Sequence, residues 1–117
     1  VPMDTVDKAF LLSTAAAVEL RSQHPLAKAV VRHASEQQLT VPEAGELTSI
    51  TARGVRAPVD GDVVEIGRAL LFEDAGVDVP QVVRDAVQRL EEAGRSTMIV
   101  RRVGHTPEFL GVLGLAD

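Results

Sequence analysis

The sequence predicts an α+β fold: one domain with a mainly antiparallel β-sheet flanked by two helical hairpins. Helix-type residues open the chain, short strand-type runs follow, and helical spacing returns before two final strand-type runs. This order lacks the regular alternation of strand and helix that builds a parallel sheet. The chain has 117 residues, 45% of them hydrophobic, and shows no linker or low-complexity tract, so residues 1–117 are expected to share one core.

Two predicted helices open the chain. Residues 4–22 are rich in Ala and Leu, and Asp4 or Thr5 is the expected N-cap of the first helix. Pro25 fits the first turn of a second helix, because its missing N–H is one that has no intrahelical partner anyway. Apolar residues then recur with helical spacing and predict one buried stripe: Leu26, Ala27, Val30, Val31 and Ala34. The two helices are expected to form a hairpin.

Strand-type runs follow at residues 46–52, 54–59 and 62–66. The dipeptide Asp60-Gly61 between the last two predicts a two-residue hairpin, because both central residues of a type I′ turn need a positive φ. Pro58 cannot donate a hydrogen bond to a neighbouring strand, which places its own strand at a sheet edge or a bulge. These runs predict antiparallel pairing.

The remaining elements complete the sheet and its second helical cover. Residues 68–75 are predicted to form a short helix, and a longer one runs from Val79-Pro80 to about Ala93. Gly94 follows, where a helix commonly ends in the left-handed conformation. Two strands joined by a turn are then expected, at residues 97–103 and 108–115.

Composition and motifs argue against several classes of function. The formal net charge is −5 and no run of Lys or Arg could follow a phosphate backbone, which argues against a nucleic-acid partner. There is no cysteine for a thiolate metal site, and His24 and His33, nine residues apart, lack a clustered third ligand. None of the motifs G-x-S-x-G, G-x-x-x-x-G-K-[ST] and H-E-x-x-H occurs, so neither catalysis nor metal binding is expected in this chain.

Two places in the sequence can hold a ligand. Glu19 lies five residues before His24, so a carboxylate and an imidazole can meet at the start of the second helix and hydrogen-bond the edge of a heterocycle. The alternative is that His24 caps the helix or packs on a neighbour. Gly54 and Gly67 either permit a tight bend or let a phosphate reach backbone N–H groups. Arg68 either pairs with that phosphate or is simply solvated.

Several short motifs are distinctive as an ordered set: Glu19, H-P-L-A at 24–27, A-R-G-V-R-A at 52–57, V-E-I-G at 64–67 and G-V-L-G-L-A-D at 111–117. Together they resemble the nucleotide-binding domain of heavy-metal-transporting P-type ATPases, the P1B class, over nearly the whole chain. Three positions depart from the family's pattern. Gln23 stands where an acid is usual, Ala52 where the first glycine of G-x-G is usual, and Arg68 where an asparagine is usual.

The resemblance implies an ATP site at the start of the second helix, with adenine held between that helix and the sheet. The family's adenine site uses the histidine and the glutamate that match His24 and Glu19. The phosphates are then expected to project outward from the domain. The nucleotide-binding residues that the resemblance implies are Glu19, His24, Pro25, Gly54, Gly67 and Arg68.

The resemblance also implies that the chain is excised from a larger membrane ATPase, as its cytoplasmic nucleotide-binding domain. The domain would deliver ATP, with Mg²⁺ in the parent protein, to an aspartate of the phosphorylation domain, and the actuator domain would be a further partner. As a fragment it is expected to be monomeric, non-catalytic and without direct contact with the membrane. The alternative is a degenerate, noncatalytic interaction domain, in which Ala52 and Arg68 mark weak or lost nucleotide binding.

Overall fold

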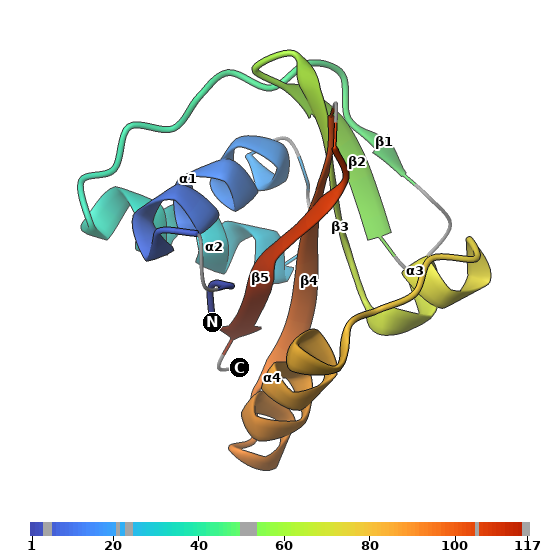
Figure 1. The fold of residues 1–117 in the computed structure, drawn as a ribbon. Helices are drawn as coiled ribbons and strands as arrows, with labels where there is room; N and C mark the ends of the chain where they lie inside the picture. The colour runs from blue at the N-terminus through green and yellow to red at the C-terminus, as the bar shows by residue number, and fades with distance from the viewer. Residues whose placement is uncertain (4–5, 21, 23–24, 50–53, 105, 116–117) are drawn as a thin grey trace.

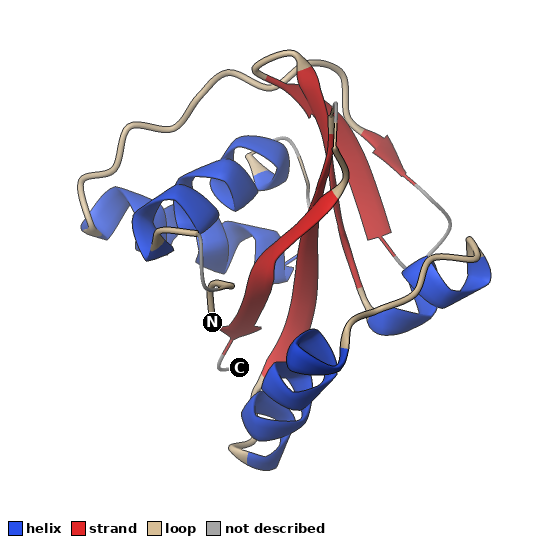
Figure 2. Ribbon diagram, viewed as in Figure 1, coloured by secondary structure: helices blue, strands red, loops and turns tan. Residues whose placement is uncertain are grey.

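The computed structural model shows one antiparallel five-stranded sheet with helices on both faces (Figures 1 and 2). It describes residues 1–3, 6–20, 22, 25–49, 54–104 and 106–115. The strands are ordered in the sheet as in the chain: β1 Thr48–Ser49, β2 Gly54–Val59, β3 Asp62–Gly67, β4 Ser96–Val103 and β5 Glu108–Leu115. The helices are α1 Lys8–Glu19, α2 Pro25–Glu36, α3 Ala69–Asp74 and α4 Gln81–Glu92. The predicted fold class is confirmed.

The sheet separates two apolar cores. Helices α1 and α2 cover one face, and α3 and α4 cover the other (Figure 1). Val100 and Ile99 are neighbours in β4 but belong to different cores, because successive side chains of a strand point to opposite faces. In β5 a register irregularity opposite Val100 and Arg101 interrupts this alternation. Leu110 therefore lies under the α1–α2 hairpin, whereas Val112, two residues later, belongs to the core under α4.

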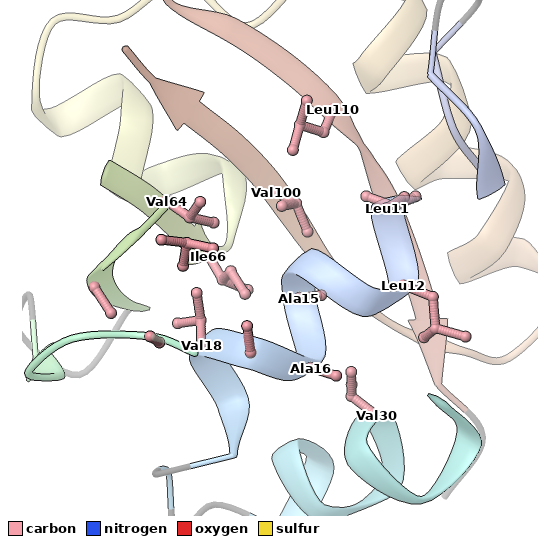
Figure 3. Packing of buried hydrophobic residues seen from close by; sticks show 14 of the residues in the cluster. Leu11, Leu12, Ala15, Ala16, Val18, Val30, Val64, Ile66, Val100 and Leu110 are labelled. Atoms are coloured by element: carbon pink, nitrogen blue, oxygen red, sulfur yellow. The ribbon is translucent and has the colours of Figure 1, made fainter. Parts of the chain in front are cut away.

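Small residues let α1 pack closely on both of its neighbours. Ala15, Ala16 and Ala17 are at most 1% exposed, so this part of the helix is enclosed on all sides. Figure 3 shows Ala16 next to Val30 of α2, and Val18 lies in the same core cluster as Ile66 of β3. This packing brings the end of α1 against the sheet.

The α4 helix offers a matched pair of valines for measuring what its burial contributes. Val83 is fully buried, whereas the adjacent Val82 is 53% exposed. Val83→Ala is expected to lower the free energy of unfolding by about 2 kcal/mol, because it removes buried methyl groups and leaves a cavity. Val82→Ala is expected to change it by less than about 0.5 kcal/mol. Urea unfolding followed by circular dichroism checks both, and equal effects would contradict the burial of this helix face.

The α1 helix begins later than its predicted N-cap at Asp4 or Thr5, which lie outside the described residues. Its N-cap is Asp7, whose side-chain oxygen accepts a hydrogen bond from the Ala9 N–H at 2.7 Å. The prediction was wrong because residues 1–3 hydrogen-bond to β5, and the N–H of Val6 then donates to the Met3 carbonyl at 2.8 Å before the helix begins. Such long-range pairing leaves no mark in the local sequence.

The predicted turn at Asp60-Gly61 and the predicted helix end at Gly94 are confirmed. Asp60 and Gly61 have φ of +51° and +85°, as the type I′ turn requires, and Gly94 ends α4 with φ of +80°. Pro58 lies beyond the part of β2 that pairs with β1. Its carbonyl accepts a hydrogen bond from the N–H of Gly45 at 2.8 Å. The proline therefore sits where β2 is bordered by a loop rather than by a full strand.

Three strands differ from their predicted ranges, and one of them, β4, does so only by beginning one residue early, at Ser96. The first, expected at 46–52, is described only as the two residues of β1, and residues 50–53 lie outside the description. The third continues one residue further than expected, to Gly67, because Gly67 pairs with Gly54 on one side and with Ile99 on the other. Gly67 thus belongs to the sheet rather than to the loop that follows.

Candidate functional site

Glu19 is the last residue of α1 and its side chain is only 4% exposed. The four residues before it, 15–18, are all buried and apolar, so the helix has no solvated face on which to place the carboxyl. Burial raises the pKa of Glu19 from 4.5 to about 7. Within the described part of the chain no ion pair opposes that rise. Near neutral pH the carboxyl can therefore both donate and accept a hydrogen bond.

Gly54 and Gly67 face each other where β2 begins and β3 ends. A Cβ added to Gly54 would lie 2.5 Å from the Ile66 carbonyl oxygen and 2.6 Å from Cδ2 of Leu71. The φ of Gly54 is not in the left-handed region, so the tight-bend interpretation is wrong for this residue. Close packing of β2, β3 and α3 explains the glycine, because there is no room for a side chain on that side.

Gly54→Ala is expected to lower the free energy of unfolding by about 1–3 kcal/mol, the usual effect of overpacking. In a Leu71→Ala background the contact with Leu71 is gone but that with the Ile66 carbonyl remains, so a smaller loss should persist. Urea unfolding of the single and double variants measures both effects. An unchanged stability in the single variant would contradict the packing explanation.

Arg68 follows Gly67 directly and is the N-cap residue of α3, with an extended backbone and no capping hydrogen bond from its side chain. The residue is exposed, and no ion pair holds its guanidinium among the described residues. The structure thus leaves both predicted roles open at Arg68, a solvated side chain or a contact to phosphate.

The remaining predicted site residues are Pro25 and His24. Pro25 is the first residue of α2, as expected from its missing N–H. His24 lies outside the described residues, as do Gln23 and Ala52, so its position opposite Glu19 stays a prediction. The structure brings Gly54, Gly67 and Arg68 together at one end of the β2–β3 hairpin.

The link between Glu19 and this hairpin end runs through the core. Val18 precedes Glu19 and Ile66 precedes Gly67, and both belong to the cluster between α1 and the sheet. Sequence reasoning missed Leu71, which fills the space beside Gly54. It also missed that Glu19 is buried, although the apolar run A-A-A-V before it is a signal for that.

Three comparisons place this geometry among known proteins. No family model matches the sequence. The chain is 37% identical over 107 residues to a probable copper-exporting P-type ATPase V of Mycobacterium tuberculosis. The matched region covers 92% of this chain but only 14% of that relative. It superposes on a zinc-transporting PIB-type ATPase in an E2·Pi state with a TM-score of 0.83 and 32% identity, over 99% of this chain and 18% of that one. The chain belongs to the heavy-metal-transporting P-type ATPases.

A further solved structure shows which part of such an ATPase the chain matches. The N-domain of HMA8, a copper-transporting P-type ATPase, aligns with a TM-score of 0.76 and 25% identity. That match covers 94% of this chain and 91% of the N-domain, so the two correspond almost end to end. The predicted resemblance is confirmed at the level of family and domain.

The described residues offer neither a membrane span nor a metal site. None of their helices combines the length and the apolar character needed to cross a membrane. No three His, Asp or Glu side chains among them gather as metal ligands.

Proposed function

We propose that this N-domain binds ATP and presents it to the phosphorylation domain of a heavy-metal-transporting P-type ATPase. The observation that supports this best is the buried carboxyl of Glu19, without an ion-pair partner among the described residues, in a chain that matches an N-domain end to end. A carboxyl near half-protonation offers a donor and an acceptor. Adenine presents the complementary pair, an exocyclic amine and ring nitrogens.

The other site residues extend this proposal along the nucleotide. His24 would complete the adenine pocket from the start of α2. Gly54 and Gly67 pair at the end of the β2–β3 hairpin, where backbone N–H groups would meet the phosphates, and the phosphates would leave the domain past the exposed Arg68. A guanidinium there can form charge-assisted hydrogen bonds to phosphate oxygens.

This chain would supply binding and delivery, and the parent protein the chemistry. An aspartate of the phosphorylation domain would accept the γ-phosphoryl group, and Mg²⁺ in the parent would neutralise charge on the phosphates. The domain would be monomeric as a fragment and cytoplasmic in the parent, and would also meet the actuator domain. The transported metal is not set by these residues, since relatives named for copper and for zinc share the fold.

Titration with ATP, followed by backbone amide NMR, tests ATP binding directly. Shifts are expected to cluster at Glu19, His24, Gly54 and Gly67, and to reappear with ADP because the adenine end makes the contacts. GTP, whose base edge has a different order of donors and acceptors, should cause weaker shifts. If about 5 mM ATP moves none of these signals, the degenerate interaction domain becomes the correct description.

His24→Ala separates the binding role of the histidine from a structural one. The variant is expected to bind ATP at least about tenfold more weakly than the unsubstituted domain, because the imidazole would contact the ligand rather than the core. Its urea unfolding midpoint should equal that of the unsubstituted domain. Calorimetric titration and urea unfolding supply the two readouts. A variant that unfolds much earlier yet binds ATP normally would establish the capping interpretation instead.

A further inference from the structure

A cavity lies away from the described residues of the candidate site. Its volume is about 670 Å³, and it is bounded by the first half of α1, the second half of α2 and the end of β5. None of the described nucleotide-site residues lines it. Its floor is apolar and built from buried side chains of three elements: Leu11, Leu12, Val30 and Val112. We call this space the basic cavity.

The rim of the basic cavity is positively charged. Lys8, Arg32 and Arg95 line it and are exposed, against the single carboxylate of Glu36. No described acidic side chain forms an ion pair with any of these three cations. The chain as a whole has a net charge of −5, so this local excess of cations runs against the overall balance. An apolar floor with an unneutralised cationic rim suits a ligand that is both apolar and anionic.

We propose that the basic cavity is the docking site of an acidic segment of the parent ATPase chain. Such a segment would place one apolar side chain on the floor and carboxylates against Arg32 and Arg95. This proposal rests on the proposed function, because it takes the domain as part of a longer ATPase. The matched relative is about seven times longer than the region matched here, since this region covers 14% of it.

The position of the cavity favours a tethered segment over a free ligand. Val1 and Leu115 both line it, so polypeptide that continues from these residues into a longer parent passes beside it. Figure 1 shows the N-terminus beside the end of β5. A tether of this kind raises the effective concentration of a nearby segment, so that few contacts suffice for docking. Docking there would bias how the domain sits relative to the rest of the ATPase.

Amide hydrogen exchange of the full-length ATPase and of this isolated chain tests the proposal. Exchange at residues 29–36 and 112–115 is expected to be about tenfold slower in the full-length protein. Arg32→Glu in the full-length protein should remove most of that protection, as should about 0.5 M salt. Lys28→Glu is the matched control, because Lys28 is an exposed residue of α2 that does not line the cavity. Arg95→Glu provides a second variant outside the helix.

Two kinds of result would overturn the docking proposal. Equal exchange in the two proteins, or protection unaffected by Arg32→Glu, Arg95→Glu and salt, would overturn the proposal. So would octanoate at about 5 mM shifting these amides in the isolated chain while the full-length protein shows no protection, because the cavity would then bind a small anion. ATP titration of the isolated chain is read separately, so a domain that fails to bind ATP but keeps the protection would refute only the nucleotide role.

Discussion

Replacing Glu19 by glutamine is expected to stabilise the domain by about 3 kcal/mol at pH 8. The difference between a folded-state pKa of about 7 and the ordinary value of 4.5 corresponds to that free energy. Between these pH values the folded chain keeps a proton that the unfolded chain has released. Stability from Glu19 is therefore fully present below pH 4.5, falls as the pH rises, and is lost above about 7.

Unfolding in urea at several pH values between 4.5 and 8 measures this effect. The chain contains no Trp or Tyr, so far-UV circular dichroism is the suitable signal. The Glu19→Gln curve should meet that of the unsubstituted chain at low pH and lie above it at high pH. Glu91→Gln, at an exposed position of α4, is the control. Its free energy of unfolding, plotted against pH, should run parallel to that of the unsubstituted chain. Parallel curves for Glu19→Gln would show that the carboxyl is not buried as described.

The helices and turns of the fold could be predicted from the sequence, because most of them depend on residues that are close together in the chain. Asp60-Gly61 gave the hairpin, and the apolar spacing before Gly94 gave α4 and its end. The start of α1 was missed because it depends on residues 1–3 pairing with β5, more than 100 positions away in the sequence. Contacts of that kind are set by the folded topology and not by local preference.

For the candidate site, the residues could be predicted from the sequence, but their burial and packing could not. The spacing of Glu19 and His24, together with the family resemblance, selected the residues. The burial of Glu19 and the crowding of Gly54 by Leu71 arise only when α1, the β2–β3 hairpin and α3 pack together. Sequence reasoning therefore found the residues, but of its two explanations for Gly54 the tight bend was wrong, and close packing on Leu71 was not foreseen.

Glu19→Ala is expected to weaken ATP binding by about 10- to 100-fold, which matches the loss of a hydrogen bond to a charged or partly charged group. Glu19→Gln should lose less than about tenfold, because the amide keeps one donor and one acceptor. Isothermal titration calorimetry measures the affinities. Thr14→Val is the matched control, since Thr14 is the other buried polar side chain of α1 and lies more than one turn before the end of the helix.

The two Glu19 predictions together distinguish a functional carboxyl from a misplaced one. A buried carboxyl without an ion-pair partner destabilises a folded domain, and such groups persist where a ligand supplies the missing partner. Glu19→Gln should then gain stability without ligand and bind ATP less well, a trade-off common at binding sites. If Glu19→Ala binds ATP as tightly as Thr14→Val does, the carboxyl has no part in the site. Adenine would then have to be held by residues other than Glu19.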